Sequence, residues 1–286
     1  MSSKPYNARV VKACEYIAQH MDDELSLNVV SDVAAVSKFH FHRLFAAFTG
    51  VSVTRFVQLE RFRRASYRLA FEPEKRVIDI ALEAGFDSPE AFSRAFKRTF
   101  EQSPSEFRQA PRWPEWHQRL TTDYKPQGEL PMDIRVVTFE PTKVAKLTHK
   151  GDPKNVLATA GKFIQWRKQT GLSPVGSSRT FGIPHSDPNT TPAEDFRWDV
   201  CGEIAEDVPA NDFGVETAVI PGGRCAVVRH RGSHANMDDT IYHIYRHWLP
   251  KNNEEVRDFP CFFHYINFIH EVDECDLLTD IYIPLK

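Results

Sequence analysis

The sequence predicts a multidomain protein in which an all-α domain with two helix-turn-helix units precedes an α+β domain of two pseudo-symmetric halves. Its length of 286 residues fits about two domains of ordinary size. Before residue 110, apolar residues recur at three- and four-residue spacings, as they do in helices, whereas stretches such as 134–139 and 224–228 alternate as strands do. Each part also contains an internal repeat.

The first part repeats itself at an offset of 51 residues, so that segment 37–56 aligns with segment 88–107. The identical pairs are Ser37 and Ser88, Phe41 and Phe92, Arg43 and Arg94, Phe45 and Phe96, Ser52 and Ser103, and Phe56 and Phe107. Each copy opens with a serine that can cap a helix N-terminus, and Pro89 suits the first turn of the second helix. The repeat therefore predicts two similar capped helices.

A short amphipathic segment precedes each serine, at 27–34 in the first copy and at 77–84 in the second. In the second copy the intervening turn is 85–87, which begins with a glycine. Helix, tight turn and capped second helix is the helix-turn-helix arrangement, which places the N-terminal turns of its second helix in the major groove of DNA. The sequence therefore predicts two DNA-reading units in one chain.

The second helix of each unit separates apolar from polar side chains. We expect the apolar stripes, formed by Phe41, Phe45, Phe92 and Phe96, to lie in the core. The polar side chains predicted to face DNA are Lys38, His42 and Arg43 in the first helix and Glu90, Arg94, Lys97 and Arg98 in the second. Arginine suits a guanine edge or a phosphate because its planar fork donates two parallel hydrogen bonds. The alternative, a merely solvated arginine face, is disfavoured because both copies retain the arginine.

A predicted helix from Ser52 to about Phe71 joins the two units. Its length of roughly 30 Å, at 1.5 Å per residue, is close to the 34–36 Å of one DNA turn, so one chain would present both recognition helices to successive major grooves. The arginines along this helix are Arg55, Arg61, Arg63, Arg64 and Arg68. We expect those that face outward to be available for phosphate contacts.

The formal net charge of −3 hides an uneven distribution. Residues 1–120 hold 18 basic and 15 acidic side chains, whereas residues 121–286 hold 18 and 24. The first part is therefore mildly basic and the second acidic, as expected if DNA binding is confined to the first. Because the excess is small, we expect binding to rest on a few placed contacts and to show a shallow salt dependence.

No apolar run approaches the roughly 18–20 residues of a membrane span, and the first residues lack a secretion signal, which predicts a cytoplasmic protein with no membrane partner. The five cysteines form no CxxC pair and are expected to be reduced and mostly buried. No phosphate loop, nucleophile with a nearby base or convincing metal-ligand pattern is present. We therefore expect no cofactor, no metal and no catalytic residue.

Residues 111–130 are predicted to form a linker between a domain at 1–110 and a domain at 131–286, because this stretch is rich in proline and has no sustained apolar period. Beyond it, segment 148–151 matches segment 229–232, and each precedes a predicted helix with a tryptophan, Trp166 or Trp248. Two such halves would leave a cleft between them as a ligand site. Aromatic residues are plentiful here, although most aromatics in such a domain belong to the core.

The first domain resembles the AraC/XylS family of transcription regulators over about residues 5–110, in segments 25–50, 61–70 and 80–108. The second copy carries the family signature GF-x-S-x-x-x-FSR-x-FK-R-x-F…SP-x-x-[FY]-R nearly intact. The resemblance implies seven helices and places base-reading residues on Phe39, His42, Arg43, Glu90, Ala91 and Arg94. Glu101 departs from the family, which usually has glycine there. It must adopt a left-handed conformation, at a cost of about 1 kcal/mol, or end the helix differently.

The second domain resembles the GyrI-like effector-binding domain over about residues 131–286, in segments 221–234, 241–250, 259–267 and 277–286. This domain order is that of the Rob-like regulators. The resemblance implies a small amphipathic, often cationic ligand between the two halves, held by aromatic rings and a buried carboxylate. The effector-binding residues predicted on this basis are Trp166, Phe181, Trp198, Phe263, Tyr265, Asp280 and Tyr282.

Phe263 stands where the family motif Pro-x-[FILV]-Glu-x-Tyr, here residues 260–265, has its carboxylate. Asp280, just before Ile281, would be the acidic group that remains near the site. We therefore expect a neutral or weakly charged aromatic or amphipathic ligand.

These observations predict a sequence-specific transcription regulator that binds double-stranded DNA and whose C-terminal domain binds a small-molecule effector or a partner, with RNA polymerase as a candidate. One alternative is a GyrI-like small-molecule hydrolase fused to a DNA-binding domain, which is disfavoured because Phe263 replaces the most obvious general base. Another is a protein-interaction module without a small ligand. The prediction is that the chain is not an enzyme.

Overall fold

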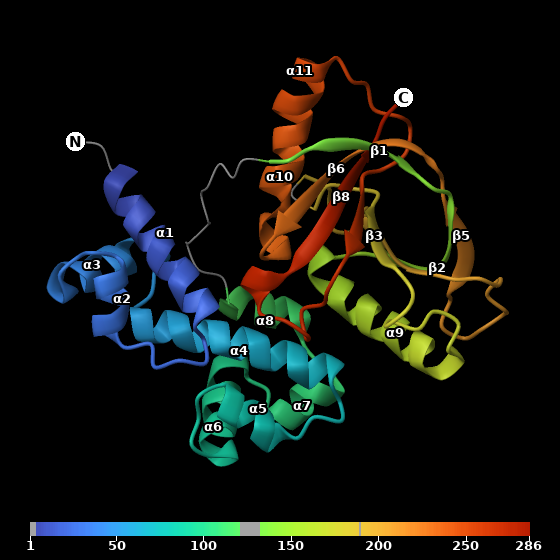
Figure 1. Cartoon of the computed structure of the whole chain (residues 1–286). Coiled ribbons are helices and arrows are strands. Elements are labelled where there is room, and N and C mark those ends of the chain that lie inside the picture. Colours follow the sequence, from blue (N-terminus) through green and yellow to red (C-terminus); the bar gives the residue numbers. More distant parts are fainter. Residues whose placement is uncertain (1–3, 121–131, 189) are drawn as a thin grey trace. The chain divides into compact units, whose positions relative to one another are not determined.

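The computed structural model describes residues 4–120, 132–188 and 190–286, and these divide into two compact units. Of the described residues, the helical unit comprises 4–120 together with Ile269–Asp276, and the sheet unit comprises 132–188, 190–268 and Leu277–Lys286. One unit is all-α and the other combines helices with a single antiparallel sheet, which confirms the predicted fold class of an all-α domain followed by an α+β domain (Figure 1).

The described part of the helical unit holds eight α-helices and the short 3₁₀ helix η4 (Glu274–Asp276). The α-helices are α1 (Lys4–Gln19), α2 (Leu27–Val33), α3 (Lys38–Thr49), α4 (Val53–Phe71), α5 (Val77–Glu83), α6 (Pro89–Phe100), α7 (Pro104–Gln109) and α8 (Trp113–Leu120). Helices α1–α3 and α5–α7 form two groups that pack against the long helix α4 (Figure 1). The predicted joining helix is confirmed, and Ser52 caps it by accepting a hydrogen bond from the Arg55 N–H.

The two helix-turn-helix units have the same backbone hydrogen bonds in their turns. In the first, the N–H groups of residues 35 and 36 donate to the carbonyls of 32 and 31, and in the second those of 85 and 86 donate to 82 and 81. The turns therefore match at an offset of 50, whereas helices α3 and α6 match at 51. The second turn is one residue longer, and Ala35 stands at φ 51° where the second unit has Gly85 at φ 77°.

Phenylalanine rings form the cores of both units. Phe41 and Phe45 are fully buried among residues of α1, α2 and α4. Phe62 of α4 centres a second cluster, with ring centroids 5.6 to 6.0 Å from those of Phe86, Phe92, Phe96 and Phe100. The prediction that the recognition-helix phenylalanines belong to the core is confirmed.

The C-terminal ends of α3 and α6 are both left-handed, at Gly50 with φ 74° and at Glu101 with φ 58°. Glu101 therefore adopts the strained conformation rather than ending the helix differently. Its carbonyl accepts from Arg112 and its carboxylate pairs with Arg119, and both contacts help to hold this conformation.

Helix α8 lies inside the stretch 111–130 that the sequence predicts to be a linker. Trp113 and Trp116 are 2% exposed and pack on Tyr67, while Trp113 also stacks on Phe71 and contacts Phe107. Residues 113–120 thus extend the helical unit, and the rest of the predicted linker, 121–130, lies outside the described residues.

The sheet unit contains one antiparallel sheet of eight strands in the order β1-β6-β8-β7-β3-β4-β2-β5. The strands are β1 (Arg135–Phe139), β2 (Thr142–Lys150), β3 (Thr180–Pro184), β4 (Arg197–Glu203), β5 (Glu216–Ile220), β6 (Gly223–Arg231), β7 (Phe262–Tyr265) and β8 (Leu278–Pro284). The sheet is curled: the ring of Phe139 on edge strand β1 lies 6.2 Å from that of Phe181 on β3, although three strands separate them (Figure 1).

Helices follow β2 and β6 in the two halves. After β2 come η1 (Pro153–Asn155) and α9 (Val156–Thr170), and after β6 come η2 (His234–Asn236), α10 (Met237–His243), the π-helical turn η3 (Ile244–Trp248) and α11 (Leu249–Asn252). If each of β1–β4 is exchanged with the strand four later, from β5 to β8, the strand order is the same when it is followed from the other edge of the sheet. The sheet therefore has the predicted pseudo-twofold symmetry.

The repeat at 148–151 and 229–232 is confirmed in detail. His149 pairs its two ring nitrogens with the Thr159 hydroxyl and the Asp152 carbonyl, and His230 pairs in the same way with Thr240 and Ser233, each 81 residues later. The tryptophans that follow, Trp166 and Trp248, are instead 82 residues apart, because η3 inserts one residue into the second helix.

Candidate DNA interface and effector site

Helix α3 exposes the polar residues that the sequence assigns to DNA reading. Lys38, His42 and Arg43 are exposed, while Phe41 and Phe45 on the opposite stripe are fully buried. Ser37 occupies the N-cap position with extended backbone, but its side chain makes no capping hydrogen bond. The side chain of Phe39 lies outside the described part of the structure.

Helix α6 presents the equivalent face of the second unit. Ser88 caps the helix by accepting from the Ala91 N–H at 3.2 Å, and Pro89 occupies the first turn. The exposed side chains of this helix include Glu90, Arg94, Lys97 and Arg98, whereas Ala91 is half-buried. Arg43 and Arg94 therefore lie on exposed faces of two equivalent helices.

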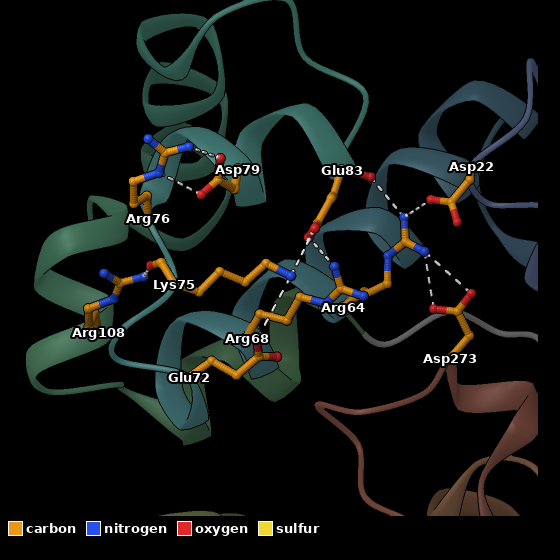
Figure 2. Close-up of polar contacts among 10 residues, drawn as sticks. All are labelled: Asp22, Arg64, Arg68, Glu72, Lys75, Arg76, Asp79, Glu83, Arg108 and Asp273. Atoms are coloured by element: carbon orange, nitrogen blue, oxygen red, sulfur yellow. Dashed lines mark hydrogen bonds and ion pairs between the residues drawn. The ribbon is translucent and has the colours of Figure 1, made fainter.

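The arginines of α4 have a different environment. Each of the five donates to a protein group: Arg55 to Gln58, Arg61 to the carbonyls of residues 21 and 23, Arg63 to Glu60 and Glu274, Arg64 to Asp22 and Asp273, and Arg68 to Glu83. Figure 2 shows Arg64 and Arg68 pointing at these partners. The expected outward-facing phosphate contacts from α4 are therefore not supported, because its arginines are engaged within the helical unit.

By contrast, neither Arg43 nor Arg94 has a hydrogen bond or ion pair to any residue that the structure describes. An exposed guanidinium with five free donors costs little in water and can form bidentate bonds with a base edge or a phosphate. The guanidinium groups of Arg43 and Arg94 are therefore available to a ligand, whereas those of the α4 arginines are bound to protein groups.

Three of the predicted effector residues gather at the centre of the sheet. Gly182 of β3 pairs in register with Phe263 of β7, and a Cβ atom at position 182 would collide with the Tyr265 hydroxyl and the ring of Trp198. The Trp198 and Phe263 ring centroids are 5.5 Å apart. We call Trp198, Phe263 and Tyr265 the aromatic cluster.

The aromatic cluster lies on the face of the sheet that the helices cover. Trp198 packs against two cores at once, one with Phe163 and Trp166 of α9 and the other with Met237 of α10. The cluster therefore bridges the two halves, where a ligand site was expected. Burial raises the pKa of the Tyr265 hydroxyl, so this side chain stays a neutral donor and acceptor near neutral pH.

The other four predicted effector residues do not join the aromatic cluster. Trp166 is 1% exposed in the core beneath α9. Phe181 and Tyr282 pack with Phe262 in a core of strand residues on the opposite face of the sheet. Asp280 also faces that side and forms a bidentate pair with Arg229, at 2.7 and 2.8 Å.

A second carboxylate, Asp199, lies at the position equivalent to Asp280, 81 residues earlier. It is 3% exposed and accepts hydrogen bonds from Thr148 at 2.6 Å and from His185 at 2.7 Å. Burial opposes its charge, but the bonds from His185 and Thr148 and the nearby Lys146 outweigh burial and hold the pKa of Asp199 below its usual value. The carboxylates of Asp199 and Asp280 thus both have hydrogen-bond donors within the protein.

Two comparisons with protein families cover these two parts of the chain. Residues 132–286, more than half of the chain, match the family described as the GyrI-like small molecule binding domain. The chain belongs to the GyrI-like family. Residues 30–110 of this GyrI-like protein match a helix-turn-helix domain family, and this domain is of the AraC type.

Curated relatives share one or both domains with this GyrI-like protein. The probable transcriptional regulator YgiV of Escherichia coli K12 is 44% identical over 156 residues, which are 54% of this chain and 98% of the relative. The transcriptional regulator Rob of Salmonella typhimurium is 26% identical over 248 residues, and the right origin-binding protein of Escherichia coli K12 is 24% identical over 249 residues. Both alignments cover 83% of each chain. This GyrI-like protein is a DNA-binding transcription regulator with a ligand-binding domain.

Two residues of the GyrI-like domain near the aromatic cluster were missed by sequence reasoning. Gly182 leaves the space that Tyr265 and Trp198 occupy, and the ring of His234 lies 5.1 Å from that of Tyr265. The signal for His234 was its place just after the repeated turn at Gly232, whereas nothing in the sequence distinguished Gly182 from other glycines.

Within the described ranges, every helix is too short or too polar to span a membrane.

Proposed function

We propose that this regulator reads double-stranded DNA with α3 and α6 of a single chain, through Lys38, Phe39, His42 and Arg43 in the first helix and Glu90, Ala91, Arg94, Lys97 and Arg98 in the second. The observation that carries the proposal is the contrast between arginines. Those of α4 are engaged by protein partners, whereas Arg43 and Arg94 are exposed at equivalent positions of the two repeats. Specific duplexes selected from randomised DNA would give the operator against which variants are tested.

We further propose that the aromatic cluster contacts a neutral or weakly charged aromatic or amphipathic effector. Phe263 stands at its centre where a carboxylate would favour a cation, and the Asp280 carboxylate is neutralised by Arg229 on the other face of the sheet. Stacking on Trp198 and Tyr265 would hold an aromatic ring. The remaining predicted residues, Trp166, Phe181, Asp280 and Tyr282, would then support the domain rather than contact the ligand.

Calorimetric titration with pairs of similar aromatic compounds, one neutral and one a quaternary ammonium, tests this proposal. We expect the neutral member to bind at least as tightly, with binding weakened in Trp198→Ala and unchanged in Asp280→Ala. Tight binding of the quaternary ammonium that Asp280→Ala abolishes would contradict it. Lack of binding by either class would favour the alternative of a protein-interaction module.

We also propose that the chain is not an enzyme and that RNA polymerase is a candidate protein partner. Curated relatives are named as transcriptional regulators, and Phe263 offers no general base at the centre of the aromatic cluster. Incubation of the pure protein with reactive esters and epoxides tests for turnover, and a pull-down of RNA polymerase with the full chain tests the partner.

A further inference from the structure

Arg64 is a cation almost withdrawn from water in the middle of α4. Its side chain is 7% exposed, and its guanidinium donates to groups from three separate segments. One Nη atom lies 2.6 Å from an Asp22 carboxylate oxygen and 2.8 Å from the Glu83 carbonyl, and the other lies 3.1 and 3.3 Å from the two oxygens of Asp273 (Figure 2). Burial opposes the charge, but these carboxylates outweigh it and raise the pKa of Arg64.

Two of these partners lie in the helix groups on different sides of α4. Asp22 lies in the turn after α1, and α1 shares its core with α2 and α3 of the first unit. Glu83 is the last residue of α5, the first helix of the second unit. The guanidinium of Arg64 therefore ties the two units to each other across α4, and the Glu83 carboxylate adds ion pairs to Arg68 and Lys75 (Figure 2).

The third partner, Asp273, comes from 209 residues further along the chain. It belongs to the inserted segment Ile269–Asp276, which follows β7 in sequence and precedes β8, yet is part of the helical unit. Glu274 of this segment pairs with Arg63 at 2.6 Å, and the Cys275 thiol contacts the Ala18 carbonyl of α1. The inserted segment thus has contacts with both α4 and α1.

The energetics make the third partner important. A buried cation is stable only while its donors are satisfied, and removing one partner leaves a desolvated donor that must find another. Without the Asp273 carboxylate, one Nη atom would lose both of its protein acceptors, and we expect the guanidinium to shift toward Asp22, whose side chain is 76% exposed, at the expense of the bond to the Glu83 carbonyl. The angle between the two units would then be less well fixed.

We propose that Arg64 is a positioning residue for DNA recognition, and that Asp273 of the inserted segment locks it so that α3 and α6 are held ready for two successive grooves. The inference rests on the proposed two-helix docking and adds that the DNA-binding unit is completed by a carboxylate supplied from beyond β7. Loss of such preorganisation lowers affinity for DNA only when both helices must dock together, because the ordering cost is paid on binding.

The test uses the full chain and two duplexes: the operator selected by wild-type protein, and the same duplex with one half-site scrambled. Fluorescence anisotropy at one fixed salt concentration gives both affinities. For Asp273→Asn we expect a loss of about threefold or more on the two-site duplex and no change on the single-site duplex. Asp273→Glu, which keeps the charge, should restore most of the two-site affinity.

The matched control is Asp207→Asn, which removes a carboxylate that is 76% exposed and pairs with Lys143 in the sheet unit. It should change neither affinity. The inference would be overturned if Asp273→Asn lost the same affinity on both duplexes, or if it left the two-site affinity unchanged. It would also be overturned if Asp273→Glu bound the two-site duplex as weakly as Asp273→Asn does. Wild-type protein that binds both duplexes equally well would instead refute the two-helix docking itself, so the two failures are distinguishable.

Discussion

Arg43 and Arg94 occupy the same position of the two recognition helices, 51 residues apart, and both side chains are exposed. Equivalent arginines in a duplicated unit are suited to contact equivalent sites on DNA, one in each groove. The five arginines of α4, by contrast, donate to protein groups within the helical unit.

Replacing either arginine should weaken specific binding. We expect Arg43→Ala and Arg94→Ala each to lose about 1–3 kcal/mol on the selected operator and much less on random DNA, if each reads a base. Their effects should add, because the two helices belong to separate units. Electrophoretic shift titrations on both DNAs measure this, with Arg135→Ala, an exposed arginine of β1, as control. Equal losses on both DNAs would reassign the two residues to phosphate contacts.

The salt dependence of binding should be shallow. With the arginines of α4 engaged internally, we expect most phosphate contacts to come from basic side chains on the exposed faces of α3 and α6. If about four phosphates are neutralised, log Kobs should fall with log salt with a slope near −3.6. Affinities measured between 50 and 200 mM salt give the slope. A value near −8 would mean that a second basic surface contacts the DNA.

The left-handed residue in the first turn should cost stability. Ala35 at φ 51° takes the place of a glycine, so Ala35→Gly should raise the free energy of unfolding by about 1 kcal/mol. The reverse change in the second turn, Gly85→Ala, should destabilise, because Gly85 is left-handed at φ 77° and a Cβ atom there would displace the Arg61 guanidinium from its bonds to the carbonyls of residues 21 and 23. Urea unfolding, monitored by the circular dichroism of the helices, measures the free energy of unfolding of both variants. A neutral Gly85→Ala variant would show that the second turn relaxes freely.

Stability should also depend on Glu60, which faces Arg63, Glu274 and Tyr67 inside the helical unit. Burial raises its pKa from 4.5 to about 7; Arg63 opposes the rise, and Glu274 adds to it. A carboxyl whose pKa is higher in the folded state contributes stability that is fully present below pH 4.5 and is lost as the pH rises through 7.

Glu60→Gln removes this titration. The variant should therefore be more stable relative to wild type at pH 8 than at pH 5. The difference in free energy of unfolding, variant minus wild type, should be larger at pH 8. Urea unfolding at the two pH values tests this, with the exposed Glu74→Gln as control. A difference that is the same at both values would show that Glu60 stays ionised throughout.

Much of the fold was predictable because short-range sequence patterns mark both internal repeats. Serine caps, three- and four-residue apolar spacing and the 148–151 repeat predicted the helices of both units and the pseudo-twofold sheet. Helix α8 was missed because proline and tryptophan in 111–116 resemble a linker, and only the contacts of Trp113 and Trp116 with Tyr67 show why it is ordered.

The candidate sites were less predictable, for two physical reasons. Neighbouring strand residues face opposite sides of a sheet, so without exact strand registers Tyr282 and Phe181 could not be separated from Phe263 and Tyr265. The partners of Arg64 also come from three segments, one of them 209 residues distant, and such a contact leaves no trace in a local pattern.

The most direct test of the two-helix account is a footprint of the full chain on its selected operator, combined with a measurement of stoichiometry. We expect one chain to protect about 20 base pairs, with the strongest contacts in two major grooves about one helical turn apart. Protection of half that length, or a full footprint that requires two chains, would contradict the claim that α3 and α6 of one molecule read DNA together.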